Sequence, residues 1–182
     1  MIIAVNKASC FDKTVDALKK GKVLILPTDT IYGFSGIVPD TEAKILKVKN
    51  RPSEKKMIQL IAKPADIYRY TNQVIPNAFF DKWPAALTLI VKSKDGSGTT
   101  AFRCPGYQWL RDVIEAVGKP LFSSSVNISG AANLSTVSEI ARTFERKVSF
   151  IVDAGDLPGA ASTVVDLTLD EPMILRRGSV AI

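Results

Sequence analysis

The chain has 182 residues, of which 46% are apolar and 23% charged, a balance typical of one globular domain with a sizeable buried core. Lys and Arg number 24 against 18 Asp and Glu, so the formal net charge is +6, which favours anionic partners such as nucleotides or RNA. Histidine is absent, which excludes Ser-His-Asp and Cys-His catalysis and every histidine-based metal site.

The N-terminus and the cysteines indicate the compartment. No stretch approaches the roughly 20 uninterrupted apolar residues that span a bilayer, and the first residues do not resemble a secretory signal. We therefore expect a soluble cytoplasmic protein. Cys10 and Cys104 form no CxxC pair, so we expect two reduced thiols rather than a disulfide or a zinc site.

The apolar pattern predicts alternating helices and strands. Helices are expected at 12–20, 64–70, 76–82, 107–117 and 137–146, together with one that is capped by Asp40 or Thr41 and stopped by Pro52. Strands are expected at 22–26, 57–62, 87–92, 120–123, 148–152, 163–167 and 173–176. This order predicts an open α/β sheet of mixed direction with flanking helices, in a single domain over residues 1–182.

Polar residues follow the first long apolar run. Thr28, Asp29 and Thr30 come directly after the expected strand at 22–26, and loops at strand ends are where open α/β sheets place ligands. The same side chains could instead bond their own backbone in a turn. A second cluster, Ser123 to Gly130, is read in the same two ways: its hydroxyls and amide could bond a phosphate, a ribose or an amino acid, or form a serine-rich turn.

Cations form the remaining candidates. The run Lys47, Lys49, Arg51, Lys55 and Lys56 leaves a helix and enters a loop, where it could bind phosphates or form a solvated basic face. Arg103 and Arg176 stand among apolar residues, and burial of either would call for an anion or hydrogen-bond partners. Both could also reach the surface through their aliphatic stems. Cys104 has no base nearby in sequence, so we interpret it as structural.

Six motifs occur in a fixed order. They are Pro-Thr-Asp-Thr-Ile-Tyr-Gly at 27–33, Lys-Asn-Arg-Pro at 49–52, Trp-Pro-Ala-Ala-Leu-Thr at 83–88, Phe-Arg-Cys-Pro at 102–105, Ser-Val-Asn-Ile-Ser-Gly at 125–130 and Ser-Thr-Val-Val-Asp at 162–166, followed by Leu175-Arg176. In this order the chain resembles the YrdC/TsaC family of threonylcarbamoyl-AMP synthases, from about Lys22 to Gly178. The resemblance implies a twisted α/β sheet around a large basic concave site that binds ATP and threonine side by side.

The resemblance also implies roles for single residues. Thr30, Arg103, Ser123 and Ser162 are expected to bind L-threonine, with Arg103 on its carboxylate. The residues expected to bind ATP are Arg51, Lys55, Thr99, Ser125, Asn127, Asn133 and Arg176. Lys49 and Arg51 are the expected catalytic cations, with a magnesium ion beside the phosphates. The chain departs from the family pattern at Lys56, Leu60, Tyr107, Val126, Ala160, Ala161 and Arg177, and we expect it to lack the C-terminal domain of longer relatives.

Two functions remain open at this point. The resemblance implies synthesis of threonylcarbamoyl-AMP from L-threonine, bicarbonate and ATP, which separate transferase proteins then use to modify tRNA. The alternative is a non-catalytic module that binds double-stranded RNA on the same basic surface, through many Lys and Arg contacts to the backbone.

Overall fold

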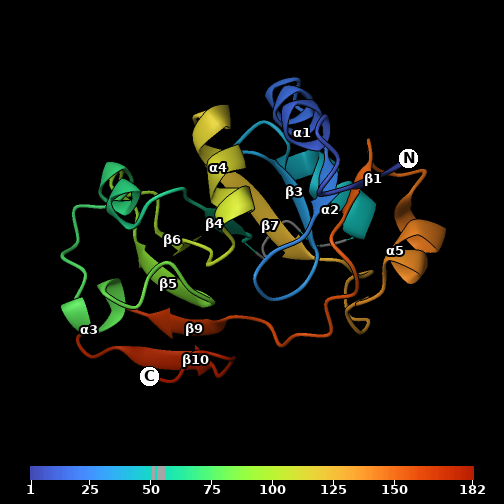
Figure 1. The fold of residues 1–182 in the computed structure, drawn as a ribbon. Helices are drawn as coiled ribbons and strands as arrows, with labels where there is room; N and C mark the ends of the chain where they lie inside the picture. The colour runs from blue at the N-terminus through green and yellow to red at the C-terminus, as the bar shows by residue number, and fades with distance from the viewer. Residues whose placement is uncertain (51, 53–55) are drawn as a thin grey trace.

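The computed structural model describes residues 1–50, 52 and 56–182 (Figure 1). The strands are β1 Ile2–Ala4, β2 Leu24–Leu26, β3 Gly33–Ile37, β4 Ile58–Leu60, β5 Leu87–Lys92, β6 Thr99–Arg103, β7 Leu121–Ser125, β8 Ile151–Asp153, β9 Thr163–Asp166 and β10 Met173–Arg176. The helices are α1 Cys10–Lys19, α2 Glu42–Lys49, α3 Asn77–Phe80, α4 Gln108–Val117 and α5 Val137–Phe144, with a 3₁₀ helix, η1, at Pro64–Arg69.

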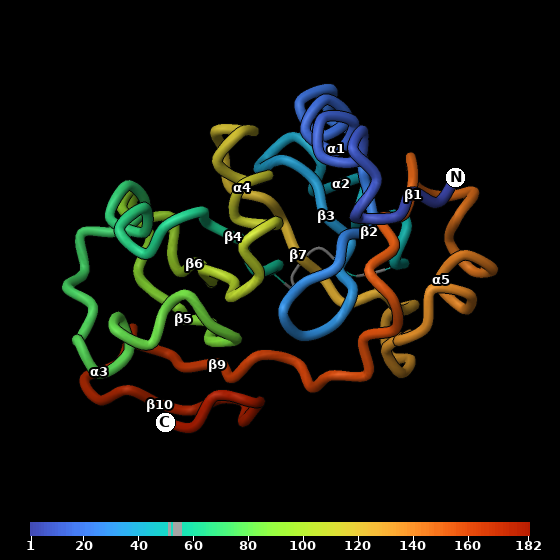
Figure 2. The backbone as a smooth tube through the Cα atoms, in the orientation of Figure 1, coloured from blue at the N-terminus to red at the C-terminus, as the bar shows by residue number. Residues whose placement is uncertain are grey.

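The strands form one mixed sheet in the order β1-β8-β2-β3-β7-β4-β6-β5-β9-β10. The pairs β1/β8, β2/β8, β4/β6 and β5/β9 are parallel, and the other neighbours are antiparallel. Because β1 and β10 are the edge strands, the two ends of the chain lie at opposite ends of the sheet (Figure 2). The expected mixed α/β sheet with flanking helices is confirmed.

Side-chain alternation along the strands builds a core on each face of the sheet. Leu24 and Leu26 of β2 pack into one apolar cluster, while Ile25 between them packs into another. Helices α1 and α4 cover the first face, and α2 and α5 cover the second (Figure 1). In α4 the residues Leu110, Val113, Ile114 and Val117 follow the i, i+3, i+4, i+7 spacing of one buried helix face.

A third apolar cluster lies at the β5–β9 end of the sheet. It joins Leu87, Leu89 and Val91 of β5 to Phe79 of α3 and Ile67 of η1. Within the described residues, none of the helices has the length and apolar character that a membrane crossing requires.

Most expected elements are present with shifted ends, and three strands were not predicted. β3 reads Gly-Phe-Ser-Gly-Ile and has weak strand propensity, but its glycines allow close packing: a Cβ on Gly33 would lie 2.7 Å from Ser123 Oγ. β1 and β6 were also missed. The expected strand at 120–123 runs through Ser125, so its three serines lie on a strand rather than in a turn. The helix expected at 64–70 is a 3₁₀ helix.

Candidate functional site

A cavity of about 380 Å³ opens beside the β2–β3 connection (residues 27–32). Its walls come from the β2–β3 connection (residues 27–32) and from β4, β5, β6, β7, β9 and β10. The lining includes hydroxyl side chains of Thr28, Thr30, Tyr32, Thr88, Ser123, Ser124, Ser125 and Ser162, and the cations Lys56, Arg103 and Arg176. Among the described residues, none of those that line it is acidic. The cavity therefore suits an anionic ligand with several hydrogen-bonding groups.

The β2–β3 connection is shaped by Thr28. Its buried hydroxyl accepts hydrogen bonds from the backbone N–H groups of Thr30, at 3.1 Å, and Ile31, at 3.2 Å, and it donates to the Ile31 carbonyl at 2.7 Å. This is the self-bonded turn that the sequence left open. The turn also holds the Thr30 hydroxyl 2.9 Å from that of Thr28 and places Thr30 on the cavity wall. The turn and the ligand-binding interpretation are therefore compatible.

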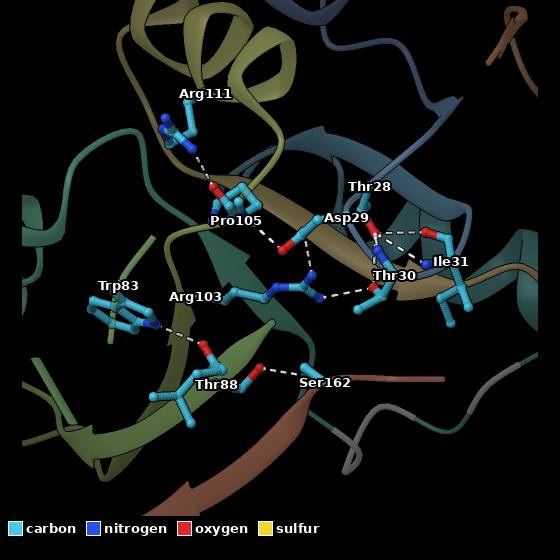
Figure 3. A network of polar contacts seen from close by, with 12 residues as sticks. Thr28, Asp29, Thr30, Ile31, Trp83, Thr88, Arg103, Pro105, Arg111 and Ser162 are labelled. Atoms are coloured by element: carbon cyan, nitrogen blue, oxygen red, sulfur yellow. Dashed lines mark hydrogen bonds and ion pairs between the residues drawn. The ribbon is translucent and has the colours of Figure 1, made fainter. Parts of the chain in front are cut away.

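Arg103, the last residue of β6, lies beneath this connection (Figure 3). It is 5% exposed; one guanidinium nitrogen donates to Thr30 Oγ1 at 3.1 Å and another to Asp29 Oδ1. Burial lowers the pKa of Arg103, and the Asp29 carboxylate acts in the opposite direction. Arg103 Nε is buried without a hydrogen-bond partner among the described residues. An unsatisfied buried donor costs about 1–3 kcal/mol, which a bound anion would offset.

Asp29 connects two loops; the sequence offered it with Thr28 and Thr30 as a candidate after the first strand, but the family resemblance gave it no role. Its second oxygen, Oδ2, accepts a hydrogen bond of 2.8 Å from the Gly106 backbone N–H. A Cβ on Gly106 would lie 3.1 Å from that oxygen, so the approach favours glycine. The sequence contained a signal for Asp29, because it stands between the two threonines of the first motif, but no spacing rule links it to a residue more than 70 positions away.

The opposite wall is tied together by Ser162 and Arg176. Arg176 Nε donates to the Ser162 carbonyl at 2.9 Å, and its Nη2 donates to Ser162 Oγ at 3.1 Å. Thr88 of β5, which sequence reasoning missed, lies 2.8 Å from the same Ser162 oxygen (Figure 3). Burial also lowers the pKa of Arg176, and its charge contributes to the lowered pKa of Arg103. The positive charge of Arg176 therefore acts on Arg103, and both arginines line the same cavity.

Lys49 is placed behind the cavity wall. It is 1% exposed, and its Nζ donates to the Ser125 carbonyl, to Asn127 Oδ1 at 2.6 Å and to the Asn127 carbonyl at 3.3 Å. The ammonium also lies 5.2 Å from the Phe34 ring centroid. Asn127 in turn accepts from Ser125 Oγ at 3.0 Å and donates to the Ala131 carbonyl at 2.6 Å. In this arrangement Lys49 fixes the chain that follows β7.

The β8–β9 connection (residues 154–162) lies beside the β2–β3 connection (Figure 2). The Tyr32 hydroxyl donates to the Gly155 carbonyl at 2.6 Å and accepts from the Ala154 N–H at 3.0 Å. Gly159 lies against the Thr30 backbone, where a Cβ would overlap the carbonyl oxygen. Thr30 is therefore held from two sides.

The expected site residues divide into three groups. Those that line the cavity are Thr30, Arg103, Ser123, Ser125, Asn133, Ser162 and Arg176. Lys49, Thr99 and Asn127 do not line the cavity. The Thr99 carbonyl accepts a 2.7 Å hydrogen bond from Lys56, which does line it. Arg51 and Lys55 lie outside the described residues.

The cysteines give no sign of reactivity. Both thiols are free and both are buried. Burial raises the pKa of Cys104 to about 12, and its Sγ donates to the Ala62 carbonyl at 3.5 Å. In the described part of the chain, no group of three or more Cys, Asp or Glu side chains gathers as a metal site would require.

The fold is a mixed α/β sheet, and its cavity is lined by hydroxyl side chains and cations. The family model described as "Telomere recombination", for Sua5, YciO and YrdC proteins, matches residues 16–178. The chain belongs to this family, which confirms the resemblance found in the motifs.

Named relatives agree with this assignment. The chain is 30% identical to a threonylcarbamoyl-AMP synthase of Pyrococcus abyssi, over 88% of this chain and 52% of the relative. It is also 30% identical to one of Bacillus subtilis, over 90% of this chain and 51% of the relative. The chain thus spans about half the length of these two relatives. A crystal structure of P. abyssi Sua5 complexed with L-threonine superposes with a TM-score of 0.88 at 28% identity, over 98% of this chain and 57% of that one.

Proposed function

We propose that the protein is a nucleotidyltransferase that makes threonylcarbamoyl-AMP from L-threonine, bicarbonate and ATP, with release of pyrophosphate and water. The observation that carries the proposal is the buried Arg103, whose Nε has no partner among the described residues and whose other nitrogens hold it against Thr30. This is a preformed place for a carboxylate. The likeness to synthases, one of them solved with L-threonine, supports that carboxylate being threonine's.

The proposed chemistry needs no enzyme nucleophile. The threonine amine would attack carbon dioxide formed from bicarbonate, giving a carbamate and releasing a proton. A carbamate oxygen would then attack the α-phosphorus of ATP, forming the acyl phosphate bond and expelling pyrophosphate. Such a displacement depends on alignment and on charge stabilisation at phosphate oxygens, which cations and hydroxyls supply.

Each wall would have its own task. Arg103, Thr30, Ser123 and Ser162 would hold L-threonine. The nucleotide would contact Ser125, Asn133 and Arg176, together with Arg51, Lys55, Thr99 and Asn127 as the family motifs imply. Lys49, with its ammonium on Ser125 and Asn127, would contribute by positioning these groups and by its charge. Because the protein offers no carboxylate cage among its described residues, magnesium would arrive with the ATP phosphates, the mode in which it is commonly bound.

The product would be an activated acyl group that a separate transferase passes to tRNA, and the proposed place of the reaction is the cytoplasm. The double-stranded RNA alternative is less well supported at this cavity. Backbone binding spreads over many cations that reach the solvent, whereas the cations among the described lining residues are Lys56, Arg103 and Arg176, and Arg103 is only 5% exposed.

The test is a reconstitution with the full chain. Protein, ATP, magnesium and bicarbonate are mixed with labelled threonine, and pyrophosphate and the labelled adenylate are both measured. Thr30→Val, which keeps shape but removes the hydroxyl, should reduce kcat/KM by about 10- to 100-fold. The matched control is Thr143→Val, a change on α5 away from the cavity. Pyrophosphate release that is equal with and without threonine would overturn the proposal.

A further inference from the structure

Thr88 and Ser162 form a pair of hydroxyls on the wall of the candidate site (Figure 3). Thr88 lies in β5, and Ser162 directly precedes β9, the parallel strand beside β5. Their Oγ atoms are 2.8 Å apart, so one hydroxyl donates to the other. The direction of this hydrogen bond decides what Ser162 can offer a ligand, and the burial of the two side chains determines that direction.

Thr88 has a single acceptor for its proton. The residue is 0% exposed, so its hydroxyl can donate only to a neighbouring protein atom. Among the described residues, the hydrogen-bond partner of that hydroxyl is Ser162 Oγ alone. If Ser162 were the donor instead, the Thr88 proton would be buried without an acceptor, at a cost of about 1–3 kcal/mol. Thr88 therefore donates to Ser162.

Ser162 Oγ then accepts hydrogen bonds from two sides. Arg176 Nη2 donates to it at 3.1 Å, and Thr88 donates to it at 2.8 Å. A hydroxyl has two acceptor lone pairs and one proton, so both lone pairs are occupied and only the proton is left. In the described part of the chain nothing accepts that proton, and Ser162, at 2% exposure, lines the cavity. Ser162 can therefore donate to a ligand but cannot accept from one.

The backbone of Ser162 is held in place as well. Arg176 Nε donates to its carbonyl at 2.9 Å. The N–H of the next residue, Thr163, donates to the Ala86 carbonyl at 3.0 Å. Gly178 packs so closely that a Cβ there would lie 2.5 Å from the Ser162 carbonyl carbon. Because the backbone is fixed, the Ser162 hydroxyl has little freedom to turn away from its two donors.

A hydroxyl that can only donate selects the group it binds. A carboxylate oxygen accepts hydrogen bonds and offers none, whereas an ammonium or an amide nitrogen offers only protons. Arg103 and Arg176 line the same cavity and favour the same kind of oxygen. We propose that Thr88 is a positioning residue, which directs the Ser162 proton at a carboxylate oxygen of bound L-threonine. This inference rests on the proposed function, which names threonine as the ligand of this wall.

The test compares L-threonine with L-threoninamide, in which an NH2 group replaces one carboxylate oxygen. Equilibrium dialysis of the full chain with labelled threonine, without ATP, gives the Kd of threonine and, by competition, that of the amide. The test variant is Thr88→Val, which keeps the shape of the side chain and frees one lone pair of Ser162. Thr88→Ser restores the hydroxyl. Thr14→Val is the matched control, because it removes a buried hydroxyl of α1 that bonds the Cys10 carbonyl outside the cavity.

Thr88→Val should weaken threonine binding by about 2- to 10-fold and lower the ratio of the amide Kd to the threonine Kd by about 3- to 10-fold, since Ser162 can then accept from the NH2 group. The ligand loses the same charge in every variant, so the change in this ratio reports the direction of the hydrogen bond. Thr88→Ser and Thr14→Val should keep the ratio of the unchanged protein. An amide that competes no better in Thr88→Val than in the unchanged protein would overturn the inference.

A double-mutant cycle separates positioning from packing. If Thr88 acts through Ser162, Thr88→Val should leave the threonine Kd almost unchanged in a Ser162→Ala background. Equal effects of Thr88→Val in both backgrounds would contradict the inference. The same measurements distinguish it from the proposed function: threonine binding without adenylate formation would contradict the proposed function alone, whereas a chain that binds no threonine would contradict both.

Discussion

Asp29 and Arg103 form an ion pair across 74 positions of sequence, with side chains only 17% and 6% exposed. The pair joins the β2–β3 connection to the end of β6, and through Gly106 it also fixes the chain that enters α4. Asp29 thereby holds the arginine in place without lining the cavity. The ligand would meet an arginine whose orientation is set before binding.

The first prediction concerns this pair. Asp29→Asn keeps the size of the side chain and can still accept from Gly106, but it leaves Arg103 buried without its counter-charge. Breaking a fully buried pair costs about 3–5 kcal/mol; because Asp29 is only partly buried, urea denaturation should show a smaller loss of stability, about 1–3 kcal/mol. The KM for threonine should also rise. Asp16→Asn, at an exposed position in the middle of α1, is the control and should change neither quantity. Unchanged stability in Asp29→Asn would contradict a buried pair.

The second prediction concerns the contact between the two connections. Gly159→Ala would push a methyl group into the Thr30 carbonyl oxygen, and a backbone atom cannot move aside cheaply. We expect a loss of about 1–3 kcal/mol in stability and a higher KM for threonine, because Thr30 would shift. The neighbouring change Ala160→Ser, at an exposed position, should be silent in both measurements. A silent Gly159→Ala would mean that the β8–β9 connection does not support Thr30.

The third prediction concerns pH. Burial raises the pKa of Cys104 from 9.0 to about 12, so the folded state keeps a proton that the unfolded state loses. The stabilisation is complete below about pH 9 and is lost as pH rises toward about 12, with a slope of up to about 1.4 kcal/mol per pH unit. Urea denaturation at a series of alkaline pH values should therefore show a shallower decline for Cys104→Ala. An identical decline in both proteins would indicate that the thiol ionises normally when folded.

The sequence predicted the elements with strong apolar runs, and the reasons for the misses are local. β5 and β10 were placed with their observed ends because apolar residues fill them. β3 was missed because Gly33 and Gly36 lower its propensity, although the sheet needs their lack of a side chain. Pro52 was expected to stop α2, but the helix ends at Lys49, where Asn50 adopts a left-handed φ of 50°.

Among the site residues, those that belong to motifs were predicted, whereas the residues that hold them in place were not. Motifs identified Thr30, Arg103, Ser162 and Arg176, all of which line the cavity. The partners that hold them, Asp29 and Thr88, come from pairing between distant strands and loops, which a single sequence does not encode as a spacing. The burial of a side chain could not be predicted from the sequence either. Lys49 is one member of a basic run in the sequence, yet in the fold it is only 1% exposed.

The last prediction separates two roles for Lys49. Its ammonium bonds the Ser125 carbonyl and Asn127, and Ser125 lines the cavity where the nucleotide is proposed to bind. Lys49→Met keeps the aliphatic length but leaves these buried acceptors unsatisfied, at about 1–3 kcal/mol each. If Lys49 acts by positioning, stability should fall and the KM for ATP should rise more than kcat falls.

A direct contact with the reacting phosphate predicts a different split, in which kcat falls steeply while the KM for ATP changes little. Lys47→Met on the exposed face of α2 is the matched control, because it removes the same charge from the same helix without a buried partner. Asn127→Ala adds a second test, since it removes one of the acceptors of Lys49 while leaving the lysine in place. Because Asn127 is itself proposed to contact the nucleotide, the deciding quantity is the coupling: a positioning role requires that Lys49→Met and Asn127→Ala together raise the KM for ATP by less than the sum of the single effects.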